Sequence, residues 1–255
     1  MDLPFAVRWK LLRQDALAAL RIAGERRVRL CEGDGRTIIH VDGQRIYAPS
    51  PLRWKLYRKG WTARLDRLAR EYGVGAHATL DEQSVVIDIG ANAGEFAHVT
   101  ARSGARVYCC EPDPIARSCL ERNVESLDGV SIHDVAIWKE NGEINFGLAP
   151  DRADSSVFVE SQRQISVRAQ TLDSFMETHA IEKVDLIKCD AEGAEPEVLD
   201  GLNERAADVA VIALDTGAER KGERTHEPCA ERLKAKGFRV VEEKIGTRWM
   251  TYGVR

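Results

Sequence analysis

The sequence contains no long apolar run. Its longest ones, residues 84–89 and 209–214, have the length of a β-strand, whereas a helix that crosses a bilayer needs roughly 20 apolar residues. The N-terminal segment also lacks the apolar core of a secretory signal. Four basic residues interrupt it: Arg8, Lys10, Arg13 and Arg21. These absences predict a cytoplasmic protein without a transmembrane segment.

The pattern of cysteines is equally informative by what it omits. Six cysteines are present, but they form no C-x-x-C pair and have no histidines at zinc-finger spacing. A structural metal site and a disulfide framework are therefore not indicated, and we predict no bound metal. Cys109, Cys110 and Cys189 lie in apolar, strand-like segments, so we expect them to be small core residues.

Charge is unevenly distributed along the chain. The net charge is -4, yet residues 1–72 contain 16 Lys and Arg against 8 Asp and Glu, so this segment carries +8 and the remainder -12. A chain of 255 residues suits one catalytic domain of about 180 residues with an added segment. We predict an N-terminal extension over residues 1–78 and a catalytic domain over residues 79–255.

Three patterns follow one another in the basic segment. Apolar residues at intervals of three and four predict a helix over residues 5–23, and short runs between glycine turns predict a small β-meander over residues 27–48. Residues 54–72 then predict an amphipathic helix with a basic face. Two interpretations of that face remain open: a solvated surface whose aromatic side chains pack on the main domain, or recognition of an anionic group on a substrate.

From Ser84 onward, strand and helix patterns alternate, which predicts a parallel sheet with helices on both faces. The expected strands are residues 85–89, 106–110, 130–135, 184–189 and 209–214. The expected helices lie near residues 95–103, 114–126, 172–179, 196–203 and 227–236, and a hairpin over residues 238–252 closes the sheet. Between two further strands, residues 149–157 form a long loop that we interpret as a lid over substrate or cofactor.

The clearest local pattern is a strand, a small-residue turn and a helix over residues 85–96. Gly90 and Gly94 allow the backbone to approach a ligand closely, and Asp88 ends the strand at the edge where open α/β sheets bind ligands. The glycine spacing differs from the G-x-G-x-x-G fingerprint of dinucleotide sites. A carboxylate at this turn favours a ligand with an ammonium group over a pyrophosphate.

Acidic residues also follow the next two strands. Glu111 ends the second strand, where a carboxylate can accept both hydroxyls of a ribose; dehydrogenases and methyltransferases share this feature. Asp134 ends the third strand, where it would accept from an adenine amino group or serve as an ordinary turn cap. The pair predicts a nucleoside ligand without identifying it.

Three carboxylates follow the fourth strand: Asp190, Glu192 and Glu195. Crowded like charges are costly unless a cation or hydrogen bonds compensate them, which is typical of functional sites. Glu195 directly precedes Pro196, so stabilisation of a helix N-terminus accounts for it. The same explanation suits Asp190 and Glu192 less well, because both precede the helix.

Together these residues closely resemble the FkbM family of methyltransferases. The resemblance covers about residues 84–215 and rests on residues 87–94 (IDIGANAG), 111–112 (EP), 171–173 (TLD), 184–195 (VDLIKCDAEGAE) and 198–201 (VLDG). It implies a class I methyltransferase fold, with a Rossmann-like, mostly parallel sheet of seven strands; the N-terminal extension lies outside the resemblance. It further implies S-adenosylmethionine as cofactor, and methylation of a hydroxyl on a sugar, glycan or natural product.

The resemblance assigns roles to particular residues. The cofactor residues that it implies are Asp88, Gly90, Asn92, Gly94 and Glu111, and Asp134 is our addition for adenine. Methyl transfer to a hydroxyl needs a base, for which Glu192 and Asp190 are the expected groups. An alternative is a divalent metal held by Asp190, Glu192 and Asp215.

Two other functions remain open from the sequence. The sheet and Glu111 also suit a nicotinamide-dependent oxidoreductase, although the glycine spacing argues against it. The +8 segment also suits a non-catalytic nucleotide-binding or RNA-binding protein. Against RNA, the aromatic side chains of residues 54–72 lie on the periodic apolar stripe, as core residues do. We therefore expect a small-molecule or glycan acceptor, anionic if the arginines contact it, and the oligomeric state stays open.

Overall fold

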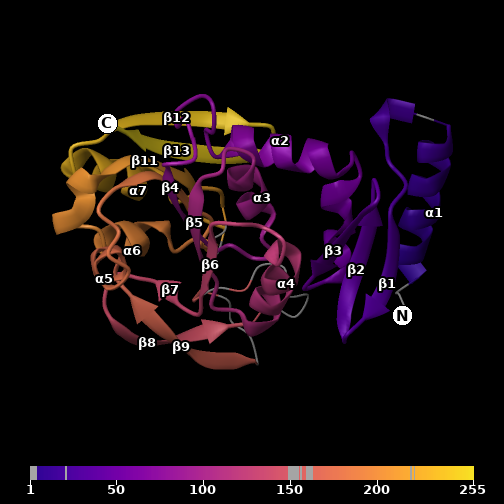
Figure 1. The fold of residues 1–255 in the computed structure, drawn as a ribbon, viewed down its shortest axis with the longest axis horizontal. Coiled ribbons are helices and arrows are strands. Elements are labelled where there is room, and N and C mark those ends of the chain that lie inside the picture. The colour runs from indigo at the N-terminus through magenta and orange to yellow at the C-terminus, as the bar shows by residue number, and fades with distance from the viewer. Residues whose placement is uncertain are drawn as a thin grey trace.

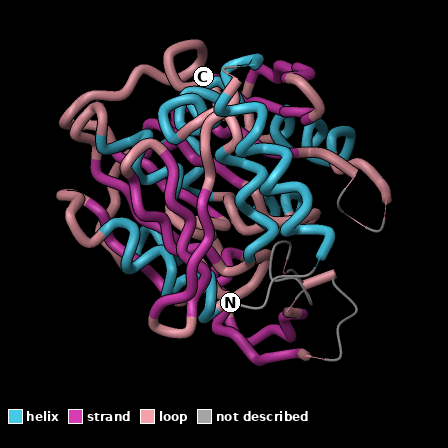
Figure 2. Tube along the Cα trace, turned by 90° about the vertical axis from the view of Figure 1, so that its right-hand side faces the viewer, coloured by secondary structure: helices cyan, strands magenta, loops and turns pink. Residues whose placement is uncertain are grey.

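The computed structural model describes residues 5–20, 22–148, 155, 157–158, 163–218, 220 and 222–255. The chain forms an N-terminal module beside a larger sheet domain, and Figure 1 shows α1 at the edge of the module that faces away from the large sheet. In Figure 2 the module faces the viewer. Within the described ranges, no helix has the length and apolar character that crossing a membrane requires.

The N-terminal module consists of a helix, a three-stranded antiparallel sheet and a second helical segment. Its elements are α1 (Phe5–Ala19), η1 (Ile22–Gly24), β1 (Arg29–Gly33), β2 (Arg36–Val41), β3 (Gln44–Ala48), η2 (Pro51–Tyr57) and α2 (Trp61–Glu71). The strands pair in the order β1-β2-β3, which confirms the predicted meander. An apolar cluster that includes Val7, Ile39 and Trp54 fills the space between them.

The predicted amphipathic helix over residues 54–72 is interrupted. A 3₁₀ segment, η2, ends at Tyr57, and α2 begins at Trp61. Gly60 separates them with a φ of +99°, and a Cβ at this position would lie 2.3 Å from a carboxylate oxygen of Asp42. Only glycine fits this turn, which redirects the chain so that the two segments contact different neighbours.

The large sheet has seven strands in the order β12-β13-β11-β10-β4-β5-β6. They are β4 (Val85–Ile89), β5 (Arg106–Cys110), β6 (Val130–His133), β10 (Val184–Cys189), β11 (Val209–Asp215), β12 (Arg239–Ile245) and β13 (Arg248–Val254). Only the pairs that involve β13 are antiparallel. The seven-stranded, mostly parallel sheet with a closing hairpin is therefore confirmed.

Helices cover both faces of this sheet, as Figure 1 shows. They are α3 (Glu95–Ala101), α4 (Pro114–Val124), α5 (Leu172–Thr178), α6 (Glu195–Asp200) and α7 (His226–Ala235), with a short η3 (Glu204–Asp208). A third sheet, ordered β7-β9-β8, comprises β7 (Ala136–Ile137), β8 (Gly142–Gly147) and β9 (Gln164–Gln170). The predicted third strand, residues 130–135, is thus shorter, because the chain leaves the large sheet after His133 and joins the small one.

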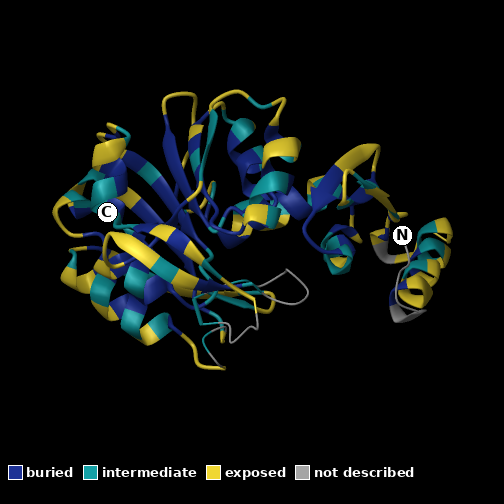
Figure 3. Cartoon of the chain, turned by 90° about the horizontal axis from the view of Figure 1, so that it is seen from below, coloured by how far each residue is buried: buried dark blue, intermediate teal, exposed yellow. Residues whose placement is uncertain are grey.

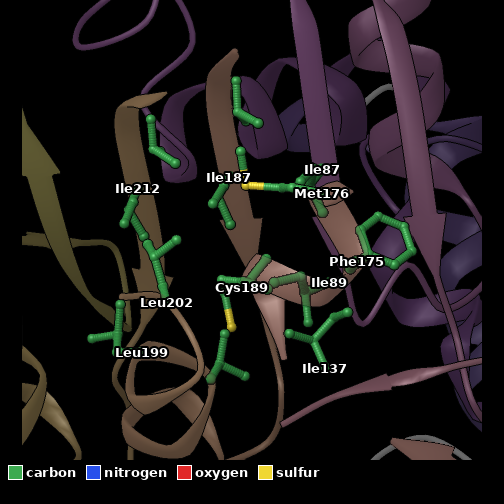
Figure 4. Packing of buried hydrophobic residues seen from close by; sticks show 14 of the residues in the cluster. Ile87, Ile89, Ile137, Phe175, Met176, Ile187, Cys189, Leu199, Leu202 and Ile212 are labelled. Carbon is green, nitrogen blue, oxygen red and sulfur yellow. The ribbon is translucent and has the colours of Figure 1, made fainter. Parts of the chain in front are cut away.

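Alternate side chains of the central strands enter different apolar clusters. Ile87 and Ile187 pack with α5 residues such as Phe175 on one face, as Figure 4 shows, whereas Val86 and Leu186 pack on the other face with α2, α3 and α4. This arrangement follows from the two-residue period of a strand and buries both faces of the sheet. Three cysteines occupy the same clusters, so their predicted core role is confirmed: Cys109, Cys110 and Cys189.

Candidate functional site

A cavity of about 300 Å³ lies where β4, β5 and β10 end, and η2, α2 and β13 also contribute side chains to its lining. Its lining includes Asn92, Glu111, Asp190 and Glu192 from the predicted site. The carboxyl ends of parallel strands are the expected location for a ligand in an open α/β sheet. The structure therefore brings together residues that the sequence places up to 100 positions apart.

The turn after β4 brings two chain segments into close contact. Gly90 has a φ of +69°, and a Cβ there would lie 2.0 Å from the carbonyl oxygen of Asp190. Gly90 is thus required by the neighbouring backbone as well as by its own conformation. Gly94 does not line the cavity; it directly precedes α3 as its N-cap, and a Cβ there would lie 2.6 Å from Leu120. Gly94 therefore serves the packing of α3 against α4.

Asp88 and Lys188 form a buried ion pair at the cavity, of which only Lys188 contributes to the lining. The Lys188 Nζ lies 2.8 Å from Oδ1 of Asp88 and donates to the carbonyl oxygens of Ile89 (3.1 Å) and Gly90 (2.6 Å). Burial opposes the charge of Lys188, but Asp88 and Asp190 outweigh it and raise the pKa of Lys188. Asp88 itself is fully buried and does not line the cavity. In this structure the ammonium group that Asp88 faces is that of Lys188.

Glu111 ends β5 with both carboxylate oxygens held by backbone donors. The Asn92 N–H donates to Oε2 (2.7 Å) and the Asp113 N–H to Oε1 (2.9 Å). Burial raises the pKa of Glu111 to about 7, despite these two hydrogen bonds. Each carboxylate oxygen retains further acceptor capacity, so the group is fixed in place and able to accept two hydroxyl donors from a ligand.

Asp134 lies away from the cavity. Its side chain is 62% exposed and forms an ion pair with Arg117 of α4. The residues that line the cavity nearby are Val135 and Ala136. The predicted contact between Asp134 and an adenine is therefore not assembled in this structure, and the alternative interpretation, a polar residue at a turn, matches its position.

Asp190 is held by two donors from distant parts of the chain. Its Oδ2 accepts from the Tyr72 hydroxyl (2.8 Å) and from Arg248 (3.0 Å), while its buried Oδ1 has no partner among the described residues. Burial alone would raise the pKa of Asp190, but Arg248, Lys188 and Tyr72 hold it well below its ordinary range. Asp190 is therefore ionised and a weak base, with one oxygen available to a ligand.

Arg248 also pairs with Asp215 at the end of β11. Burial and the charge of Asp190 raise the pKa of Asp215 to about 6. Two of the three carboxylates in the metal alternative, Asp190 and Asp215, thus share the guanidinium of Arg248. Within the described part of the chain, no three His, Cys, Asp or Glu side chains form a group that could hold a metal ion.

The loop between β10 and α6 presents Glu192 to the cavity. Glu192 has a φ of +50°, a conformation that costs free energy for a residue with a side chain and often occurs at functional positions. Asn92, with a φ of +49°, is a second residue of this kind in the lining. Glu195 supports the loop: its Oε1 accepts from the N–H groups of Ala191 and Gly193, both at 3.1 Å.

The basic residues of η2 and α2 turn inward to a carboxylate of α3. Glu95 accepts from Arg53 (3.3 Å), Tyr57 (2.8 Å) and Arg64 (3.4 Å). Although burial opposes ionisation, the two arginines lower the pKa of Glu95 to about 2. Arg58 pairs instead with Glu25 within the module. Arg53 and Arg64 therefore join the module to α3, and Arg58 acts within the module. The interpretation of a solvated basic face does not describe Arg53 and Arg64, whose side chains are largely buried.

Among the lining residues that the sequence analysis did not assign to the site are Tyr72, Lys188 and Arg248. A lysine inside an apolar strand is a detectable signal, and it could have identified Lys188 as the partner of a buried acid. Tyr72 was assigned to an apolar stripe, and nothing in the local pattern distinguishes its hydroxyl. Arg248 lies 58 residues from Asp190, which no periodicity reveals.

The predicted lid over residues 149–157 lies mostly outside the described residues. Of this loop the structure describes Ser155 and Val157, and both line the cavity. The Ser155 hydroxyl donates to Oδ2 of Asp113 at 2.9 Å. The loop therefore reaches the cavity at these two positions, beside the carboxyl end of β5.

The strand order and the acidic carboxyl ends of β4, β5 and β10 define the class I methyltransferase fold, in agreement with the sequence prediction. The family model described as "Methyltransferase FkbM domain" matches residues 88–240. The chain therefore belongs to the FkbM family of methyltransferases.

Curated relatives are similar to parts of the chain. The 2-O-methyltransferase NoeI of Sinorhizobium fredii is 31% identical over 140 residues, which cover 47% of this chain and 58% of that protein. The hexuronic acid methyltransferase AglP of Haloferax volcanii is 25% identical over 144 residues, covering 55% and 60%. Methyltransferase 1 of Beauveria bassiana is 24% identical over 193 residues, covering 66% and 77%. The first two matches thus span less than two thirds of those relatives.

Proposed function

We propose that this protein transfers a methyl group from S-adenosylmethionine to a hydroxyl of a sugar or glycan. The observation that carries the proposal is the convergence of Glu111, Asn92, Asp190 and Glu192 on one cavity of about 300 Å³. The two relatives whose names specify a 2-O-methyltransferase and a hexuronic acid methyltransferase support a sugar as the acceptor.

The polar groups of the cavity suit the cofactor. Glu111 has acceptor capacity for two ribose hydroxyls, and the buried Oδ1 atoms of Asn92 and Asp190 have no partner among the described residues. Such orphaned acceptors fit the ammonium group of the cofactor, because a buried acceptor without a donor is costly. When bound, S-adenosylmethionine supplies an electrophilic methyl group on a sulfonium.

The remaining chemistry falls to the residues around the acceptor hydroxyl. In our proposal Glu192 removes the proton from the hydroxyl. Asp190 is the poorer base, since Arg248 and Lys188 keep its pKa low; it orients the reactants instead. Rigid alignment of the two reacting groups contributes several kcal/mol in such transfers, and general-base assistance contributes about 10² to 10⁴ in rate.

Replacement of Glu192 by glutamine tests the assignment of the base. Glu192→Gln retains shape but removes proton affinity, so kcat should fall by about 100-fold or more while the Kd for S-adenosylhomocysteine stays nearly unchanged. Asp190→Asn is the companion variant. Normal kcat in Glu192→Gln with an inactive Asp190→Asn would exchange their roles, and normal kcat in both would remove them from the chemistry.

The acceptor class is tested with a radiolabelled methyl donor. Neutral hexoses, deoxyhexoses and hexuronic acids are incubated separately with the protein, and the labelled product is treated with mild alkali. A methyl ether survives this treatment, whereas a methyl ester is hydrolysed. We expect alkali-stable label on a sugar; alkali-labile label would assign methylation to a carboxylate, and label on none of the sugars would contradict a sugar acceptor.

A further inference from the structure

The outer face of α1 and the segment directly after it display apolar side chains to solvent. Trp9 and Leu12 are each 64% exposed, Leu20 is 70% exposed and Ile22 is 45% exposed. Among the described residues, these four are the exposed large apolar side chains of the molecule. Contiguous apolar surface of this kind marks an interaction site in a folded protein.

The sequence of α1 arranges this surface as a stripe. Residues three and four apart lie on the same face of a helix, so Trp9, Leu12, Ala16 and Ala19 follow one another along it, and all four are exposed. The opposite face is the one that packs: Val7 is buried in the apolar cluster of the module, and Gln14 donates to Glu25 at 2.6 Å. The helix is thus docked through its other face, and the stripe is left uncovered by the described residues.

Basic side chains border the stripe. Lys10 and Arg13 are exposed on one side of it, and Arg8 is exposed on the other. The acidic residue in this helix, Asp15, is paired with Arg27 at 3.6 Å. Its surroundings are therefore positive, and its partner must be both apolar and anionic.

We propose that α1 binds the surface of an anionic lipid membrane, with Trp9, Leu12 and Leu20 inserted at the boundary between headgroups and acyl chains. Trp and Leu on an exposed helix face, bordered by Lys and Arg, are features of helices that lie in a membrane interface; the opposite face of α1 is docked on the module. Anionic headgroups attract the bordering cations. A symmetric contact between two copies would instead place the basic borders of both helices side by side, at an electrostatic cost.

The position of α1 permits such binding. It lies at the outer edge of the N-terminal module, away from the seven-stranded sheet, as Figures 1 and 3 show. Contact through α1 therefore leaves the cavity at the carboxyl ends of β4, β5 and β10 uncovered. The inference is independent of the proposed acceptor, because it rests on residues that do not line the cavity.

Cosedimentation with vesicles tests the proposal on the full chain. We expect the protein to sediment with vesicles of equimolar phosphatidylglycerol and phosphatidylcholine, and to bind pure phosphatidylcholine much more weakly. Trp9→Ser with Leu12→Ser should lower the partition coefficient by about tenfold or more, since both apolar side chains are lost. Lys10→Gln with Arg13→Gln should lower it about tenfold, and added salt should weaken binding of the wild type.

A matched pair of exposed residues on the other domain provides the control. Lys234→Gln with Arg239→Gln removes the same charge and should leave vesicle binding unchanged. The four altered side chains of α1 are exposed, so the thermal unfolding midpoint should also be unchanged. Absence of wild-type binding to the anionic vesicles would overturn the proposal. So would a concentration-dependent dimer, seen by sedimentation velocity, that Trp9→Ser with Leu12→Ser abolishes while no vesicle binding occurs.

Discussion

Glu111 combines a fixed position with an unusual affinity for protons. Two backbone N–H groups orient its carboxylate, yet burial raises its pKa to about 7. Near neutral pH the free protein therefore contains a mixture of protonated and ionised Glu111. A ligand that donates hydroxyl hydrogen bonds to this carboxylate favours the ionised form, so binding and proton release are coupled at this residue.

The coupling predicts a pH dependence of cofactor binding. Ligand hydroxyls lower the pKa of Glu111 in the complex, so below pH 7 the protein must release a proton to bind. The affinity for S-adenosylhomocysteine should therefore fall as the pH drops below about 7, by up to about tenfold per pH unit, and level off at alkaline pH. Calorimetry between pH 5 and 8, in steps of about one pH unit, measures this dependence of the affinity on pH.

The Glu111→Gln variant is the control for this pH dependence. Its side chain cannot ionise, so the part of the slope that Glu111 causes should disappear, with weaker binding throughout. Glu195, whose pKa burial also raises to about 7, does not line the cavity, and Glu195→Gln should retain the slope. A wild-type affinity that is constant from pH 5 to 7 would contradict the ribose-binding role of Glu111.

At the scale of elements, Glu95 joins the N-terminal module to the methyltransferase domain. Residues from η2 and α2 meet the first turn of α3 in a buried group of two arginines, one tyrosine and one carboxylate. Their side chains are almost fully buried: Arg53 is 12% exposed, Arg64 7% and Glu95 5%. A buried carboxylate that compensates two guanidinium groups cannot be lost without leaving uncompensated charge.

Removal of this carboxylate should therefore destabilise the protein strongly. Glu95→Ala should lower the free energy of unfolding by about 3 to 5 kcal/mol, as measured by urea denaturation. Asp66→Ala is the matched control, because its ion pair with Arg102 is 47% and 44% exposed, and loss of such a pair costs about 1 kcal/mol or less. Equal losses in the two variants would contradict the structural importance of the Glu95 group.

Elements were predicted well where a local pattern determines them. Hydrophobic periodicity and turn residues predict the alternating strands and helices from residue 84 onward. They also predict the short strands of the meander. The break in the helix of residues 54–72 was missed because Gly60 is tolerated within many helical patterns. Its φ of +99° and its close approach to Asp42 depend on tertiary packing, which periodicity does not contain.

At the scale of the whole molecule, the site depends on contacts between distant segments. Its members at strand ends, Glu111, Asp190 and Glu192, were predicted because topology places the carboxyl ends of parallel strands together. Tyr72 and Arg248 were not, since they reach Asp190 across 118 and 58 residues. Asp88 and Asp134 lie at the expected positions in the chain, but the fold pairs them with basic side chains. Asp88 pairs with Lys188, and Asp134 pairs with Arg117.

Titration calorimetry at pH 8, with S-adenosylhomocysteine and NADH as separate ligands, tests whether the cavity beside Glu111 binds S-adenosylmethionine. Our account predicts micromolar binding of S-adenosylhomocysteine and no binding of NADH by the wild type. In Glu111→Ala the affinity for S-adenosylhomocysteine should be weaker by about tenfold or more, because two charge-assisted hydrogen bonds are lost. Binding of NADH by the wild type, or equal affinity of both proteins for S-adenosylhomocysteine, would contradict it.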